Sequence, residues 1–141
     1  MALNYKDLNM KEKRAICSGC GAKAGGRKPP CFRFFEASCD MHDFGYWVGG
    51  DEDRRSTCDA RFYQAMLRDA NRLGRWYNPK KVWFKWLARR YYKAVVRYGV
   101  EHFYYTDTPR VMADVQKYVR GYGKTHVWKK ACEEWVPKGE K

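Results

Sequence analysis

A histidine stands beside an aspartate within the stretch Cys-Asp-Met-His-Asp-Phe-Gly-Tyr, which spans residues 39–46. Four of its side chains follow the i, i+3, i+4, i+7 pattern and would share one helix face: Cys39, His42, Asp43 and Tyr46. An imidazole can take a proton, and a neighbouring carboxylate can hold a hard cation. These residue types at this spacing therefore predict a site that activates a water molecule.

A glycine-rich segment precedes this stretch. Residues 17–31 contain four glycines and two prolines, which predicts a loop. Because glycine tolerates positive φ, such a loop can turn its carbonyl oxygens toward one point. Calcium takes about 6–8 oxygen ligands, commonly carbonyls and a carboxylate. Gly19, Cys20 and Gly21 with their neighbours would supply the carbonyls, and Asp43 would supply the carboxylate.

Start and stop signals place the chemistry on two consecutive helices. The first is predicted over about residues 32–47 and ends before two glycines. The second starts at the acidic residues 51–53 and runs to about residue 73, where a glycine follows. On this second helix Asp59 lies about where it would accept a hydrogen bond from His42. That bond would fix the tautomer of the ring and stabilise its protonated form.

The rest of the chain is also predicted to be helical. A third helix is expected over about residues 79–104, because Asn78-Pro79 is a cap followed by a proline. Its expected apolar positions are Trp83, Leu87, Tyr91, Ala94, Val95 and Tyr98, and its basic positions, four apart, are Lys81, Lys85, Arg89, Lys93 and Arg97. A shorter helix is expected from Thr108-Pro109 to Arg120, and residues 124–136 are expected to form one or two helical turns. No β alternation is evident, so the predicted fold class is all-α.

Length and charge limit the domain organisation and the partners. A chain of 141 residues can bury one sizeable core, so we expect a single domain over residues 17–136, a charged lead-in at 1–16 and a charged tail at 137–141. Aromatic residues make up 17% of the chain, which predicts a core built largely from rings. The formal net charge of +13 favours polyanionic partners such as nucleic acid or an anionic lipid surface.

Targeting signals and cysteines indicate the compartment only in part. No segment approaches the roughly 20 apolar residues of a membrane span, and the N-terminus lacks the apolar region of a signal peptide. Five of the six cysteines fall in the first 60 residues. Their clustering favours an oxidising compartment, whereas the missing leader favours a reducing one, and the two interpretations stay open.

The order and spacing of these elements resemble the secreted phospholipase A2 superfamily, most closely its compact bacterial and fungal members. The residues that carry the resemblance are the glycine-rich loop, the Cys-x-x-His-Asp-x-x-Tyr motif at 39–46, and a following helix that reads Asp-Arg-Arg-Ser-Thr-Cys-Asp-Ala-Arg-Phe-Tyr-Gln-Ala-Met at 53–66. The resemblance covers about residues 17–70. It implies a phospholipase A2-like fold, in which two antiparallel helices carry the His/Asp site beside a calcium loop.

The resemblance also implies a role for each motif residue. His42 would be the general base that takes a proton from the water attacking the sn-2 ester, Asp59 would orient it, and Tyr46 would hydrogen-bond Asp59. Calcium would be the cofactor, polarising the ester carbonyl. Its ligands would be the carboxylate of Asp43 and the carbonyls of Gly19, Gly21 and Lys23. The family pairing of the cysteine before the histidine implies a disulfide from Cys39 to Cys20 or else to Cys17.

The expected activity is therefore calcium-dependent hydrolysis of the sn-2 acyl ester of glycerophospholipids, and the expected partner is an anionic phospholipid surface rather than nucleic acid. The basic positions of the third helix and the many aromatic residues suit such a surface. The missing leader implies an extracellular or membrane location reached by a route that no signal peptide encodes, as in a viral, phage or effector protein.

Two other functions are weighed against this one. Four cysteines are enough for a structural zinc site in a basic nucleic-acid-binding protein without enzymatic activity: Cys17, Cys20, Cys31 and Cys39. Against it, the wide spacing of the last two is not the tight pair of a zinc knuckle. It also leaves His42, Asp43 and Asp59 without a role. A phospholipase fold that has lost catalysis is the third possibility, and the presence of all three residues argues against it.

Overall fold

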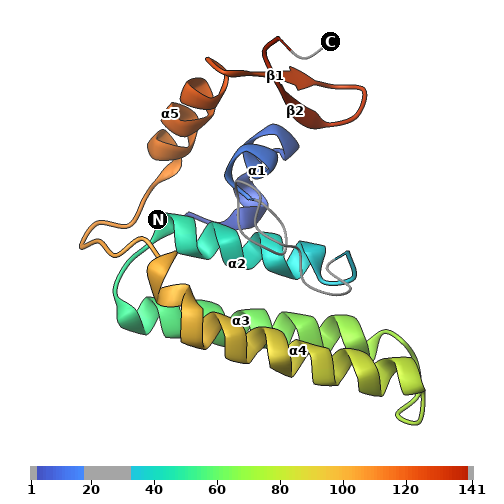
Figure 1. Cartoon of the computed structure of the whole chain (residues 1–141). Helices are drawn as coiled ribbons and strands as arrows, with labels where there is room; N and C mark the ends of the chain where they lie inside the picture. Colours follow the sequence, from blue (N-terminus) through green and yellow to red (C-terminus); the bar gives the residue numbers. More distant parts are fainter. Residues whose placement is uncertain (1–2, 18–32, 140–141) are drawn as a thin grey trace.

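The computed structural model describes residues 3–17 and 33–139, and within them helices predominate. In chain order the elements are the 3-10 helix η1 (Tyr5–Asp7), α1 (Met10–Ile16), α2 (Glu36–Val48), α3 (Glu52–Asn71), α4 (Pro79–Tyr98), the 3-10 helix η2 (Gly99–Glu101), α5 (Met112–Tyr122), β1 (His126–Lys129) and β2 (Glu134–Pro137). Helices α3 and α4 lie side by side as a long hairpin, and α2 packs on α3 (Figure 1). The prediction of a mostly helical chain is confirmed, but the fold class is not all-α, because β1 and β2 form a small two-stranded sheet.

Local signals explain where the two long helices begin. Asp51 caps α3 by accepting a hydrogen bond from the backbone NH of Arg54 at 2.9 Å. Asn78 caps α4 in the same way through the NH of Lys80, and Pro79 occupies the first helical turn, as predicted. Helix α4 ends at residue 98 rather than at about 104, because the chain tightens into η2 at Gly99.

Helix α2 ends where the sequence predicted, at the two glycines. Gly49 and Gly50 have φ angles of 81° and 143°, which side chains with a Cβ rarely adopt. A Cβ on Gly49 would also overlap the backbone oxygen of Tyr104, because the segment after η2 runs past this turn. Gly50 makes backbone hydrogen bonds with Tyr104 and Thr106, both at 3.0 Å. The turn that joins the two site helices is thus tied to a distant part of the chain.

Two hydrophobic clusters lie on either side of α2. One fills the space between α2, α3 and α4, with Phe35, Cys39, Phe62, Met66, Leu87, Ala88 and Tyr91. The other joins α2 to the chain ends, with Leu8, Ile16, Cys17, Phe44, Val48 and Val115. Ring contacts such as the stacked pair Phe34–Phe84, with centroids 3.9 Å apart, show the aromatic character predicted for the core. Helix α2 is therefore held from both sides.

The charged N-terminal segment contains a helix that its charge pattern did not predict. Asn9 and Glu12 form a capping box, in which each side chain accepts from the other residue's backbone NH at 2.9 Å. Leu8, Ala15 and Ile16 are buried. Helix α1 therefore contributes to the second hydrophobic cluster despite its charged sequence.

The prediction for residues 124–136 was wrong, because β1 and β2 pair there as an antiparallel hairpin. Trp128 lies opposite Trp135 and Val127 opposite Val136. Facing aromatic and β-branched pairs stabilise strands, and this cross-strand pairing outweighed the weak helical signal. The preceding helix was also misplaced at its start: α5 begins at Met112, not at the Thr108-Pro109 pair.

The predicted apolar face of α4 is partly wrong. Leu87 and Tyr91 are buried against the core as expected. Trp83, Ala94 and Tyr98 are exposed, whereas Ala88 is buried and Phe84 partly buried. The helix is thus rotated so that a different row of side chains faces α2 and α3. The sequence did not specify this rotation, because aromatic residues occur on several faces of α4.

No helix among residues 3–17 and 33–139 combines the length and the apolarity that a membrane span requires.

Candidate active site

The site lies between α2 and α3, which approach each other closely at Gly45. A Cβ built on Gly45 would lie 2.8 Å from the Sγ of Cys58 on α3, a distance that side chains do not tolerate without a shift. This approach brings the face of α2 that carries His42 against the face of α3 that carries Asp59. Both side chains are buried, with residue exposures of 8% and 2%.

The predicted hydrogen bond between His42 and Asp59 is present. Nε2 of His42 lies 2.7 Å from Oδ1 of Asp59. Since a carboxylate oxygen accepts, Nε2 is assigned as the nitrogen that carries the proton in the neutral form of the ring. Nδ1 is then the nitrogen with a free lone pair, and none of the hydrogen bonds among the described residues engages it. Phe62 stacks on the ring with centroids 4.5 Å apart and fixes its plane.

Tyr46 binds the same carboxylate, also as predicted. Its hydroxyl donates to Oδ1 of Asp59 at 2.5 Å, and its ring lies 4.2 Å from that of His42. Burial of Tyr46, followed by its hydrogen bond to the Asp59 carboxylate, raises the pKa of the phenol well above its usual value. The hydroxyl therefore stays protonated and acts only as a donor to Asp59.

The structure adds a charged network that the sequence analysis missed. NH1 of Arg55 lies 3.5 Å from Oδ2 of Asp59, and its NH2 lies 2.6 Å from Oε1 of Glu52. Tyr105 donates to Oε2 of Glu52 at 2.6 Å. The hydrogen bonds from Arg55 and Tyr105 lower the pKa of Glu52 to about 2. The i, i+4 spacing of Arg55 and Asp59 was the available signal.

Gly99 is a further residue whose role the sequence did not reveal. It is buried in η2 against Tyr46, and a Cβ built on it would overlap the Tyr46 hydroxyl and approach two ring carbons at 3.1 Å. The 3-10 helix after α4 thus has to carry a glycine, because the Tyr46 ring lies directly against the backbone there. Gly99 acts through Tyr46 and is a positioning residue.

Gly99→Ala is expected to lower the free energy of unfolding by about 1–3 kcal/mol, because the added methyl group displaces the Tyr46 ring. The measurement is chemical denaturation of the variant. The matched control is Gly121→Ala on α5, where a Cβ meets no atom within 4 Å and where alanine favours the helix. Equal stability changes in the two variants would contradict the close approach of Gly99 and Tyr46.

Tyr46→Phe is expected to cost about 1 kcal/mol of stability, because the phenylalanine ring keeps the packing and loses one donor to a buried carboxylate. Hydrolytic turnover is expected to fall less than in a variant that lacks the imidazole, since Asp59 keeps its bond to His42. Thermal unfolding and initial rates measure the two effects. Tyr98→Phe is the control because Tyr98 is 59% exposed, and an equal loss there would show that the change is unspecific.

The remaining predicted site residues are not all placed. Asp43 lies on α2 next to His42 and is half-buried. Gly19, Gly21 and Lys23 lie outside the described residues, as do Cys20 and Cys31. The carboxylate of Asp43 fits the oxygen chemistry of a calcium ligand, and successive helical residues point about 100° apart, so it borders the face that carries the base.

The cysteines decide one of the two predicted pairings. Cys39 is disulfide-bonded, whereas Cys17 is not in a disulfide, and its Sγ lies 3.3 Å from the backbone oxygen of Asp40. The alternative pairing of Cys39 with Cys17 is therefore wrong. The pairing with Cys20 stays a prediction, because Cys20 lies outside the described residues.

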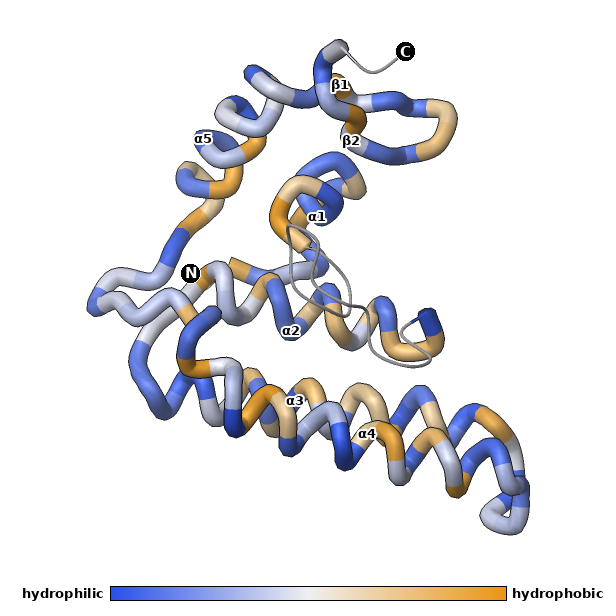
Figure 2. Tube along the Cα trace, viewed as in Figure 1, coloured by the Kyte–Doolittle hydropathy of each residue, from blue (hydrophilic) through white to orange (hydrophobic). Residues whose placement is uncertain are grey.

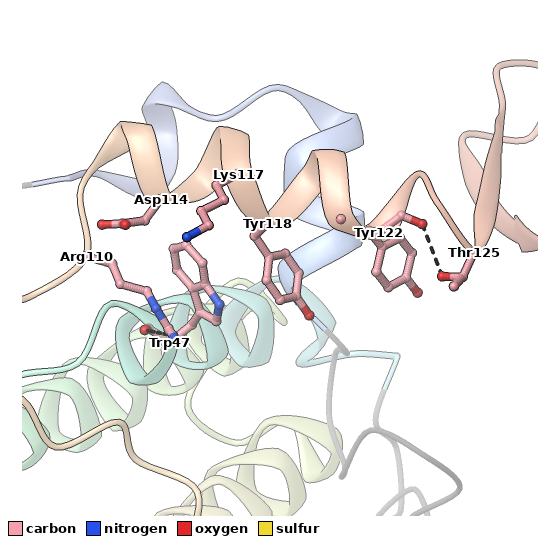
Figure 3. Close-up of a pocket in the computed structure, with 8 residues that line it drawn as sticks. Trp47, Arg110, Asp114, Lys117, Tyr118, Tyr122 and Thr125 are labelled. Carbon is pink, nitrogen blue, oxygen red and sulfur yellow. Dashed lines mark hydrogen bonds between the residues drawn. The ribbon is translucent and has the colours of Figure 1, made fainter.

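A separate pocket of about 520 Å³ lies between α2 and α5 (Figure 3). Its lining residues are Trp47, Arg110, Asp114, Lys117, Tyr118, Gly121, Tyr122 and Thr125. Arg110 donates to the backbone oxygen of Trp47 at 2.6 Å and lies over the Trp47 ring. Trp47 follows Tyr46 on α2, but His42, Asp43, Tyr46 and Asp59, the predicted site residues that the structure describes, do not line this pocket.

Comparison with protein-family models, curated proteins and solved structures finds no match for this chain. The resemblance to the phospholipase A2 superfamily thus rests on the sequence alone: the glycine-rich loop, the motif at 39–46 and the helix sequence at 53–66.

Proposed function

We propose that the chain is a phospholipase A2-like enzyme that hydrolyses the sn-2 acyl ester of glycerophospholipids in a calcium-dependent reaction, releasing a fatty acid and a lysophospholipid. The observation that carries the proposal is the buried 2.7 Å bond between His42 and Asp59 across two helices. When a carboxylate holds the Nε2–H group of a histidine, the other ring nitrogen, Nδ1, can act as a base.

The proposed reaction begins with proton transfer from water to Nδ1 of His42 as the water oxygen attacks the ester carbonyl. Asp59 stabilises the imidazolium that forms, because its Oδ1 accepts the Nε2 hydrogen bond throughout. When the tetrahedral intermediate collapses, the bond to the glycerol oxygen breaks and Nδ1 returns the proton to that oxygen. The products are the free acid and the lysophospholipid alcohol, and the base is regenerated.

Asp59 is held ready for this role by its three donors. His42 and Tyr46 bind Oδ1, and Arg55 lies near Oδ2. These contacts prevent rotation of the carboxylate and compensate its burial, which would otherwise be costly. The Asp59 side chain therefore orients the imidazole without leaving its own position.

Calcium is the proposed cofactor, held by the carboxylate of Asp43 with the carbonyls of Gly19, Gly21 and Lys23. When bound, it supplies Lewis-acid polarisation of the ester carbonyl and stabilises the developing oxyanion. Asp43 follows His42 directly on α2, which supports this assignment, because a calcium ion bound by Asp43 would lie close to the proposed base.

The proposed setting is the surface of an anionic phospholipid membrane, since the chain carries a formal charge of +13. The zinc-dependent nucleic-acid binder is a weaker alternative. It requires Cys39 as a free thiolate, whereas Cys39 is disulfide-bonded, and Cys17 makes a thiol contact with a backbone oxygen.

The decisive experiment measures fatty-acid release from phospholipid vesicles in the presence of calcium and, in parallel, of chelator. Turnover that calcium supports and chelator removes is the expected result. Absent or calcium-independent release would refute the proposal, and stoichiometric zinc by elemental analysis of the same preparation would then favour the nucleic-acid binder.

A further inference from the structure

A group of large apolar side chains is exposed at the end of the α3–α4 hairpin that lies far from both chain termini (Figure 1). We call this group the Trp tip: Trp76 (81% exposed), Tyr77 (59%), Val82 (59%), Trp83 (48%) and Trp86 (49%). Neighbouring rings contact each other, since Trp76 and Tyr77 have centroids 5.7 Å apart and Trp83 and Trp86 5.1 Å apart. Soluble proteins rarely gather so much aromatic surface without a partner for it.

The rotation of α4 explains why the Trp tip faces outward. The helix buries Leu87, Ala88 and Tyr91 against the core. By the 100° turn per residue, Val82 and Trp86 lie on the opposite side of the helix, with Trp83 at the edge of that outer face. Val82, Trp83 and Trp86 thus lie on the outer surface of a well-packed helix, and Trp76 and Tyr77 lie in the connection that precedes it.

Exposed cations recur along the outer face of α4, beside the tip and beyond it. Four of them, spaced four residues apart, are here called the basic collar: Lys85, Arg89, Lys93 and Arg97. Arg90 lies over the Trp86 ring at 5.2 Å, which links the tip to the basic residues. Residues 70–100 contain nine Lys and Arg residues and no Asp or Glu. Strongly hydrophilic positions recur along this helix in Figure 2.

We infer that the Trp tip inserts into the interface of an anionic phospholipid bilayer while the basic collar contacts the lipid phosphates. Aromatic side chains favour the boundary between headgroups and acyl chains, and Lys and Arg bind anionic headgroups. Exposed rings with cations among and behind them suit this boundary, because the rings can reach the acyl chains while the long Lys and Arg side chains keep their charges at the phosphates. The choice of a lipid partner rests on the proposed function, whereas the surface itself is identified from exposure and charge.

Two other partners fit this surface less well. Single-stranded nucleic acid stacks its nucleobases on open aromatic faces. Trp83 and Trp86 instead stack on each other, and Val82 has no ring on which a nucleobase could stack. A second copy of the chain in a symmetric pair would bring the basic collars together, with no acidic residue in 70–100 to offset them.

The test measures sedimentation with vesicles of ether-linked phosphatidylglycerol, which cannot be hydrolysed at an acyl ester, in the presence of chelator. Trp83→Ala/Trp86→Ala is expected to weaken binding by about tenfold or more, because both rings leave the interface. The matched control is Met10→Ala/Val127→Ala, which removes two side chains of similar exposure (43% and 50%) elsewhere on the surface. The control is expected to bind like the unmodified protein.

A second pair of variants separates the position of charge from its amount. Each Lys or Arg to Glu exchange removes two units of charge, so Arg89→Glu/Lys93→Glu and Lys124→Glu/Lys129→Glu both carry +9 instead of +13. Only the first pair is expected to lose binding, and binding to ether-linked phosphatidylcholine is expected to be weaker throughout. Equal losses in the two pairs would show unspecific attraction and overturn the inference.

Hydrolysis of a monomeric short-chain phosphatidylcholine with calcium reports on catalysis independently. The tip variants are expected to keep this activity and their thermal unfolding midpoint. Unchanged vesicle binding by Trp83→Ala/Trp86→Ala overturns the inference even if the protein is an active hydrolase. Preference of the unmodified protein for DNA over vesicles also overturns it. Vesicle binding through the tip without any hydrolysis leaves the inference standing and refutes the proposed function.

Discussion

His42→Gln is expected to abolish calcium-dependent fatty-acid release, with turnover falling by about 10³-fold or more, while the protein stays folded. A positioned general base commonly contributes about 10²–10⁴-fold. Glutamine has an amide NH that can still donate to Asp59, so the buried carboxylate keeps a partner. It has no nitrogen lone pair where Nδ1 stood and cannot take a proton from water. Initial rates on vesicles, together with thermal unfolding, measure both parts of the expectation.

The matched control for this variant is His102→Gln, which makes the same exchange at an exposed position in the segment after η2. It is expected to keep full turnover. Retained turnover in His42→Gln would refute His42 as the base. A large fall in its unfolding midpoint would mean that the lost turnover reflects lost folding. The loss of turnover would then be compared with that of Tyr46→Phe and Gly99→Ala, which lower stability but keep the imidazole.

Asp43→Asn is expected to weaken calcium binding and, with it, to abolish hydrolysis at the calcium concentrations that just saturate the unmodified protein. Asparagine keeps the size of the side chain and one carbonyl oxygen but lacks the negative charge that a hard divalent cation requires, so affinity is expected to fall by about tenfold or more. Titration calorimetry with calcium alone measures this loss without relying on turnover. The variant is expected to unfold at nearly the same temperature in chelator, where the ion makes no contribution.

Asp107→Asn is the control for the Asp43 variant, since it removes one negative charge at an exposed position outside the helices. Its calcium affinity is expected to equal that of the unmodified chain. Unchanged calcium binding in Asp43→Asn would refute Asp43 as a ligand even if hydrolysis were impaired. Loss of turnover with intact calcium binding would assign Asp43 a role in the reaction that does not involve the metal.

Local signals predicted the parts of the fold and the site that depend on neighbours in sequence. Asp51 and Asn78 cap their helices as their residue types indicate, and the glycines after residue 48 end α2. The pairing of His42 with Asp59 was predictable because both occupy the inward face of consecutive helices joined by a short turn. Helical periodicity alone carries that information.

The features that the sequence did not predict depend on contacts between distant segments. Gly99 is needed only because Tyr46, more than fifty residues earlier, lies against it. The rotation of α4 could not be derived because the neighbouring residues Trp83 and Phe84 are both aromatic, and only packing against α2 and α3 decides which of them turns inward. The hairpin of β1 and β2 depends on the contact between Trp128 and Trp135 across the strands. The helical periodicity of each segment by itself does not predict this contact.

The hairpin has a further consequence for the two ends of the chain. Trp135 on β2 donates through Nε1 to the backbone oxygen of Lys11 on α1 at 2.9 Å, and the Lys11 ammonium lies 5.2 Å from the Trp135 ring centroid. Helix α1 and strand β2 are thereby held together, and Ile16 of α1 packs in the second hydrophobic cluster with Phe44 and Val48 of α2. Removing α1 would therefore uncover part of this side of the helix that carries His42. The packing of the helix that carries the proposed catalytic base thus depends on a helix near the N-terminus that is distant from His42 in sequence.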